Sequence, residues 1–151
     1  MARHWSVGIA LVLLLALTLV SLPLPRGGSN GVYNTISRTM WCRTMSACLH
    51  EVGHRLDQEA GWASHSKEFG KAVETYVLVE FWEGKPSDTA RAIVNLPGVF
   101  SWRGSYFGDS QSEIYAIIFE KAEGQEDKMP EIFRGFYNWE RAEALVQKYV
   151  R

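Results

Sequence analysis

The sequence lacks the excess of basic residues that a nucleic-acid partner would require. Its 151 residues contain 16 lysines and arginines against 17 aspartates and glutamates. Among the first 26 residues only Arg3 and Arg26 are charged, because His4 is counted as neutral. The remaining chain therefore holds 14 basic against 17 acidic residues, a net charge of −3. Nucleic-acid-binding proteins carry a basic patch or stripe, so we expect no nucleic-acid partner.

Internal repeats and low-complexity tracts are also missing, and the chain is too short for two domains of ordinary size. It is long enough for one domain with a hydrophobic core. Proline, glycine, serine and asparagine dominate PLPRGGSNG, which is typical of a linker. We therefore predict one folded domain over residues 27–151, preceded by a separate segment over residues 1–26.

That segment contains a run without charge from Val7 to Leu22, which follows Arg3 and ends at Pro23. A positive region followed by an apolar region is the layout of a signal peptide. The run has no clean small-x-small cleavage site, and it is shorter than the ~20 residues that a full membrane span prefers. A cleaved signal peptide and a retained membrane anchor both stay open. Either one predicts an extracytoplasmic domain, which is secreted or tethered to the membrane through residues 7–22.

Only two cysteines occur, Cys42 and Cys48, and both lie in the exported part. An oxidising compartment favours a disulfide between them. Residues six apart do not share a face of one helix, so a bridge requires Cys42 to precede the helix that contains Cys48. A disulfide and two free thiols that pack as small hydrophobic groups both stay open.

Helical patterns dominate the exported part. Residues 31–41 (GVYNTISRTMW) are the one strand candidate before the histidines, and residues 44–59 carry apolar side chains at three- and four-residue steps. The predicted fold class is therefore α+β, mostly helical, with a minimal N-terminal strand segment. Further helices are predicted after Ser64 or Ser66, after Ser87, from Ser110 to before Gly124, from Pro130 and after Asn138.

Within the predicted helix 44–59 the chain reads CLHEVGHRLDQ, which contains the pattern H-E-x-x-H. His50 and His54 lie four residues apart on one helix face, so both imidazoles can bind a single Zn²⁺ ion. Glu51 lies on the neighbouring face, where it can take a proton from a zinc-activated water. The pattern predicts a catalytic zinc site. The alternative is an amphipathic helix without metal.

A catalytic zinc site needs a third protein ligand and an open fourth position. The metzincin pattern would place a glycine three residues and a histidine six residues after His54, but Asp57 and Ala60 stand there. His65 follows the predicted helix and is interpreted as a surface residue. The metzincin pattern is therefore excluded, and a carboxylate from another helix is the better candidate for the third ligand.

Glu113 is the candidate carboxylate, because it lies in the first turn of the helix predicted from Ser110. Ser110-Gln-Ser-Glu113 also has the form of a capping box, in which Glu113 would bind the first amide of its own helix. Periodicity does not decide between ligand and cap.

The blocks HEVGHRLD, SKEF and SYFGDSQSEIYAIIFE, in this order, resemble the catalytic domains of the anthrax lethal factor-like family, which includes the Pro-Pro endopeptidases. These are zinc peptidases of the gluzincin type, and the resemblance extends over roughly residues 44–150. It implies a zincin-like metallopeptidase domain, one Zn²⁺ ion, and an endopeptidase that cleaves a peptide or protein substrate bound in extended form.

Residue by residue, the resemblance implies His50, His54 and Glu113 as metal ligands and Glu51 as general base. Tyr106 matches the tyrosine whose hydroxyl stabilises the oxyanion of the tetrahedral intermediate. Asp57 matches an acidic residue one turn beyond the second histidine, where a hydrogen bond to a ligand and an ordinary helix-end role both stay open.

Two departures from the family motivate an alternative. Ile117 stands where lethal factor has a further glutamate, four residues after its ligand glutamate. Only about 20 residues precede the histidine helix, whereas gluzincins usually place several strands there and use the edge strand to hold substrate. The alternative function is a non-catalytic zinc- or peptide-binding domain with the same fold, and a second rival is a membrane-anchored helical domain without metal.

Overall fold

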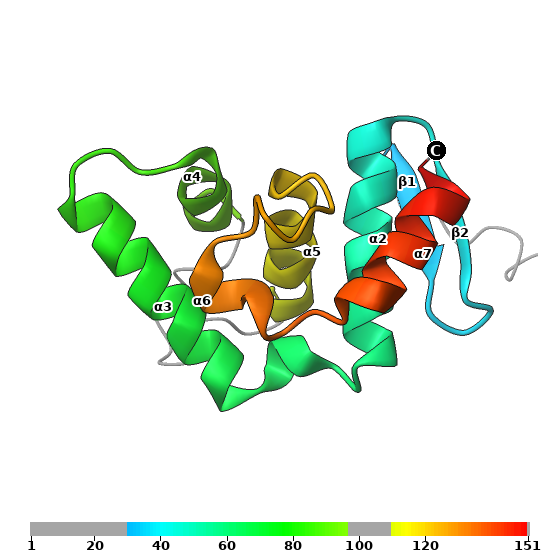
Figure 1. Cartoon of the computed structure of the whole chain (residues 1–151), viewed down its shortest axis with the longest axis horizontal. Coiled ribbons are helices and arrows are strands. Elements are labelled where there is room, and N and C mark those ends of the chain that lie inside the picture. Colours follow the sequence, from blue (N-terminus) through cyan, green and yellow to red (C-terminus); the bar gives the residue numbers. More distant parts are fainter. Residues whose placement is uncertain (1–29, 97–109, 151) are drawn as a thin grey trace, which may run out of the picture.

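Two helices, α2 (Met45–Glu59) and α5 (Gln111–Lys121), lie side by side at the centre of the molecule (Figure 1). The computed structural model describes residues 30–96 and 110–150, so the proposed leader over residues 1–26 and Tyr106 lie outside the described residues. A two-stranded sheet and α7 (Trp139–Tyr149) pack on α2, and α4 (Asp88–Val94) packs on α5. The predicted α+β class with mostly helical content is confirmed.

The prediction of one strand over residues 31–41 is wrong, because these residues form a hairpin of β1 (Gly31–Asn34) and β2 (Thr39–Cys42). The Asn34 side-chain oxygen accepts hydrogen bonds from the backbone amides of Ile36 (3.0 Å) and Ser37 (2.9 Å). An asparagine that bonds to the backbone ahead of it is a common turn former. The chain therefore reverses at residues 35–38 and does not continue as one strand.

A disulfide between Cys42 and Cys48 ties the end of β2 to the first turns of α2. Cys42 precedes the helix, as a bridge across six residues requires. Thr44 begins α2, and its hydroxyl accepts a hydrogen bond from the Ala47 amide (3.2 Å). The bridge and the cap together hold the hairpin against the helix that carries the two histidines.

The predicted helices after residue 60 are confirmed in number and place within the described residues. Ser66, not Ser64, caps α3 (Lys67–Trp82), while Ser64 lies in a short 3-10 turn, η1 (Ala63–His65). Ser87 and Asn138 cap α4 and α7 through their side-chain oxygens, and α6 (Glu131–Arg134) follows Pro130. Such caps typically contribute about 1 kcal/mol each.

The core lies between α2, α3, α5 and the C-terminal helices. Figure 1 shows α3 and α4 on the side of α5 that faces away from the hairpin. Aromatic side chains fill much of this space. Its largest fully buried side chains are Tyr115, Phe69, Phe119 and Phe133. The hairpin and α7 therefore pack on the α2 side of the central pair, and α3 and α4 lie on the α5 side.

α2 and α5 approach each other closely at Gly53. A Cβ added to Gly53 would lie 2.7 Å from the Ala116 Cα and 3.2 Å from the Ala116 Cβ. The glycine inside the H-E-x-x-H pattern therefore lets the two helix backbones come together. Glycine in a helix interior normally costs about 1 kcal/mol relative to alanine, so this position is set by packing and not by helix propensity.

We expect Gly53→Ala to lower the free energy of unfolding by about 1–3 kcal/mol, because overpacking would exceed the gain in helix propensity. Gly70→Ala is the matched control, since Gly70 lies within α3 and a Cβ there meets nothing within 4 Å. This control should raise stability by up to about 1 kcal/mol. Urea denaturation of both variants measures the difference, and equal stabilisation by both would contradict the close approach.

A cluster of charged side chains joins α2 to α7. The Glu59 carboxylate accepts hydrogen bonds from Arg141 Nε (2.6 Å), Arg141 Nη2 (2.9 Å) and Arg55 Nε (2.9 Å). The Arg141 guanidinium, with Arg55 beside it, overcomes partial burial and lowers the pKa of Glu59 from 4.5 to about 2. The ionised form of Glu59 is therefore favoured in the folded protein.

Because the folded-state pKa of Glu59 is lowered, its stabilising contribution is present above pH 4.5 and is lost as the pH falls from 4.5 toward 2. We expect the stability difference between wild type and Glu59→Gln to be largest at pH 6 and to shrink across that window. Denaturant titrations at a series of pH values measure this difference. A constant difference from pH 6 to pH 2 would contradict the assignment.

Candidate metal centre

His50 and His54 occupy successive turns of one face of α2, as their four-residue spacing predicts. Their rings meet edge to face, with centroids 4.8 Å apart and an interplanar angle of 82°. The two Nε2 atoms lie 3.2 Å apart. Both imidazoles therefore present the same ring nitrogen to one point in space.

Glu113 brings a carboxylate to this point from the first turn of α5. Its Oε2 lies 3.2 Å from His50 Nε2, and its Oε1 lies 3.3 Å from His54 Nε2. Ser110 begins the helix without a side-chain capping hydrogen bond. Of the two roles that the sequence left open, the geometry places Glu113 with the imidazoles and not in a capping box.

The three side chains form a group that could hold a metal ion, with their ligand atoms all within 4.8 Å of one another. Ligand atoms that are each ~2.0–2.1 Å from one tetrahedral ion lie about 3.3 Å apart. The two Nε2 atoms lie 3.2 Å apart, and each lies 3.2 or 3.3 Å from a different oxygen of Glu113, which is close to that separation. The donor set and its spacing therefore fit a tetrahedral metal site.

Two further side chains hold the imidazoles from behind. Glu120 Oε2 lies 3.2 Å from His50 Nδ1, and Ser112 Oγ lies 3.1 Å from His54 Nδ1. A histidine that ligates a metal usually donates its other N–H to such a partner, which fixes the tautomer and the ring orientation. Both Nδ1 atoms therefore have hydrogen-bond partners, and both Nε2 atoms face the position where the two imidazoles and Glu113 converge.

Sequence reasoning missed Glu120. The family resemblance indicates the position four residues after Glu113, where Ile117 stands, whereas Glu120 lies seven residues after Glu113 and therefore on the same helix face. The Ser46 hydroxyl also donates a hydrogen bond to Glu120 from the start of α2. A search of the helix face two turns beyond Glu113 would have found this carboxylate.

The charges of the cluster are strongly coupled. Burial lowers the pKa of His50, but hydrogen bonds and charge from Glu113 and Glu120 outweigh it and raise the pKa to about 9. The two imidazoles hold the pKa of Glu113 well below its ordinary range. Burial opposes the effect of His50 and Ser46 on Glu120, yet its pKa is also lowered. The carboxylates of Glu113 and Glu120 are therefore ionised, and a metal ion that binds here would displace the proton of His50.

Glu51 lies beside the cluster and beneath β1. It is 7% exposed, and burial raises its pKa although His54 and His50 act in the opposite direction. A Cβ on Gly31 would lie 2.9 Å from Glu51 Cγ and 3.0 Å from its Oε1. The predicted general base is therefore packed against the strand on one side and borders the ligand cluster on the other.

Of the three remaining candidate residues, Asp57 and His65 lie within the described residues. Asp57 is fully buried, and it accepts hydrogen bonds from the Ser64 amide (2.8 Å) and the Ser64 hydroxyl (2.7 Å). It therefore fixes the turn after α2 and does not support a ligand. His65 is exposed and stacks on Trp62. Tyr106 lies outside the described residues, so its predicted role stays a prediction.

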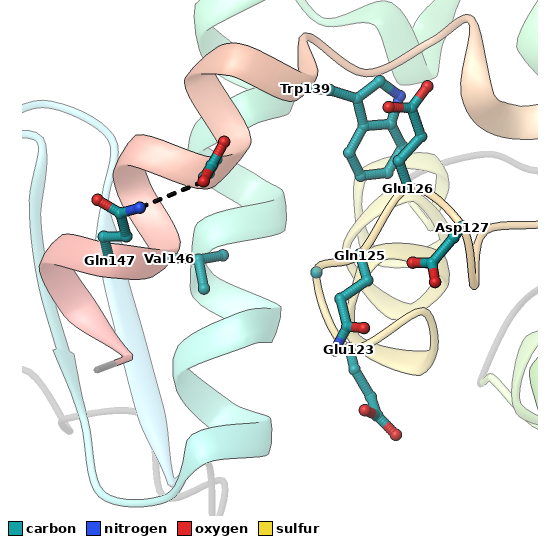
Figure 2. Close-up of a pocket in the computed structure, with 9 residues that line it drawn as sticks. Glu123, Gln125, Glu126, Asp127, Trp139, Val146 and Gln147 are labelled. Carbon is teal, nitrogen blue, oxygen red and sulfur yellow. Dashed lines mark hydrogen bonds between the residues drawn. The ribbon is translucent and has the colours of Figure 1, made fainter.

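The cluster opens into a cleft of about 420 Å³ between β1, α2 and α5. Another hollow of about 270 Å³ lies between the loop after α5 and α7, and Figure 2 shows Glu123, Glu126 and Asp127 on that loop and Trp139 at the start of α7. That hollow contains no histidine. The cleft at the cluster is lined by Gly31, Val32, Tyr33, Thr35, His50, Glu51, His54, Trp62, Ser112 and Glu113.

No protein-family model, curated protein or solved structure matches this chain. The resemblance to lethal factor-like peptidases therefore remains a prediction from the sequence. Among the helices within residues 30–96 and 110–150, none has the length and apolar character of a membrane-spanning segment.

We expect Glu120→Ala to weaken zinc binding about 10–100-fold, since loss of an outer partner of a histidine ligand typically has this effect. Glu113→Ala removes a ligand and should weaken binding more than Glu120→Ala does. Glu123→Ala, at an exposed position that pairs with Lys128, is the matched control. Competition titrations with a zinc-binding dye measure all three dissociation constants. Unchanged affinity in Glu120→Ala would remove Glu120 from the centre.

Proposed function

We propose that this protein is a zinc-dependent endopeptidase of a zincin-like type. The observation that carries the proposal is the convergence of His50 Nε2, His54 Nε2 and the Glu113 carboxylate beside the buried Glu51. Two imidazoles and one carboxylate are a donor set of catalytic zinc sites. The proposed occupant is one Zn²⁺ ion.

An open site supports catalysis over a purely structural role. Structural zinc sites are closed by four protein ligands, whereas catalytic sites keep one position for water or substrate. Among the described residues, the metal-ligand group has three members. The Glu113 side chain is 50% exposed, and the cleft reaches all three ligands. A fourth position is therefore accessible from solvent.

In the proposed mechanism, bound Zn²⁺ would lower the pKa of a water to about 7 and polarise the scissile carbonyl. Glu51 would take a proton on its carboxylate as the water attacks and then deliver it to the leaving amine nitrogen. Its burial and raised pKa suit an acid–base group that must both accept and return a proton. Tyr106 would bind the oxyanion, as the family resemblance implies.

The proposed substrate is an extended segment of a peptide or protein. Among residues 30–96 and 110–150, β1 pairs with β2 on one side, and no strand of this part of the chain pairs with its other edge. Gly31, Val32 and Tyr33 of β1 line the cleft together with the ligands. An extended chain can add to such an edge through main-chain hydrogen bonds. The hairpin thus supplies one edge strand despite its small size.

The proposed location is extracytoplasmic. It rests on the apolar run over residues 7–22 in the sequence, which would direct export and could also tether the domain to the membrane. The disulfide between Cys42 and Cys48 is consistent with an oxidising compartment.

We expect Glu51→Gln to retain about one equivalent of zinc and to lose peptidase activity, because the amide cannot accept the proton from water. A general base typically contributes about 10²–10⁴-fold to the rate. Elemental analysis gives the zinc content, and cleavage of a fluorogenic peptide library gives the activity.

Glu68→Gln on the surface of α3 is the control and should match wild type in both measurements. Full activity in Glu51→Gln would contradict the proposed mechanism. Zinc binding by wild type without any peptide cleavage would favour the alternative, a non-catalytic zinc- or peptide-binding domain. A purified protein without zinc would favour a helical domain that needs no metal.

A further inference from the structure

We propose that β1 positions the general base, with Gly31 as the residue that makes this possible. The inference rests on the proposed function, because it assigns a role toward Glu51 in the same site. Its structural part is that the absence of a side chain at Gly31 leaves space for Glu51. This part can be tested without catalysis.

The contact between Gly31 and Glu51 leaves no room for a side chain. A Cβ at Gly31 would lie 2.9 Å from Glu51 Cγ, 3.0 Å from Glu51 Oε1 and 3.3 Å from the Ala47 carbonyl oxygen. Real Cβ atoms essentially never lie within 3.0 Å of another atom, as this one would from Glu51 Cγ, and contacts of 3.0–3.4 Å are uncommonly tight. Glu51 Cγ sits near the root of its side chain, so moving it away also moves the carboxylate.

The strand cannot easily yield instead. The disulfide from Cys42 to Cys48 ties β2 to α2, and Gly31 is paired with Cys42 across the hairpin. The Tyr33 hydroxyl also bonds to the Gln58 side chain near the other end of α2. The hairpin is thus attached to α2 on both sides of Glu51, which makes the glutamate side chain the part that must move.

The backbone of β1 also meets the carboxylate. The Asn30 carbonyl accepts a hydrogen bond from the Arg43 amide (2.7 Å), and bonded positions alternate along an antiparallel pair. Gly31 and Tyr33 therefore direct their backbone groups to the edge away from β2. At that edge the Tyr33 backbone faces Glu51 and lowers the pKa of its carboxyl, although burial has the larger, opposite effect. One strand would thus orient the base and offer its edge to the peptide.

Gly31→Ala in the full chain tests this role, with Gly70→Ala as the matched control in open space. Since misplacement of a catalytic group by 1 Å can cost about 10²-fold, we expect kcat to fall about 100-fold. The zinc dissociation constant should stay within about 2-fold of wild type, because the atoms nearest to the added Cβ belong to Glu51 and Ala47 and not to His50, His54 or Glu113. A merely structural role would lower stability or zinc affinity together with activity.

A second measurement does not depend on catalysis. In the metal-free protein, the amide proton of Tyr33 should change its NMR chemical shift in Gly31→Ala and in Glu51→Ala, and keep it in Gly70→Ala. An unchanged Tyr33 shift in both site variants would overturn the proposal even if wild type proves inactive. An unchanged kcat in Gly31→Ala of an active enzyme would also overturn it, without affecting the proposed function.

Discussion

The close contact between α2 and α5 at Gly53 is the constraint on which the rest of the structure depends. Because Gly53 has no side chain, the helix backbones meet at Ala116, three residues beyond Glu113. That approach sets the separation between the imidazoles of α2 and the carboxylates of α5. The spacing of 3.2 Å between His50 Nε2 and its neighbours in Glu113 and His54 follows from this helix packing.

The hairpin imposes a second constraint from the opposite side of α2. Its disulfide anchors it at the start of the helix, and its strand β1 covers Glu51. Adjacent residues of α2 therefore face different elements. His50 turns toward α5 and its carboxylates, while Glu51 turns toward β1. The two side chains therefore have different surroundings, with carboxylates beside His50 and a strand over Glu51.

Local structure was largely predictable from the sequence. Thr44, Ser66, Ser87 and Asn138 begin helices through side-chain caps, which act within a few residues and leave a readable pattern. The hairpin was not foreseen, because two four-residue strands and a tight turn occupy the length of one strand. A hairpin differs from a single strand in the hydrogen bonds of Asn34 to the turn amides, and these bonds form only when the chain folds.

For the site, the sequence by itself determined the pair His50 and His54 and the neighbouring Glu51, because helical periodicity alone places them. Tertiary structure decided the contacts between side chains of different helices. It directed Glu113 to the imidazoles and not to its own helix end, and it placed Glu120 behind His50. A capping box and a ligand have the same local spacing, so only the packing of α5 against α2 separates them.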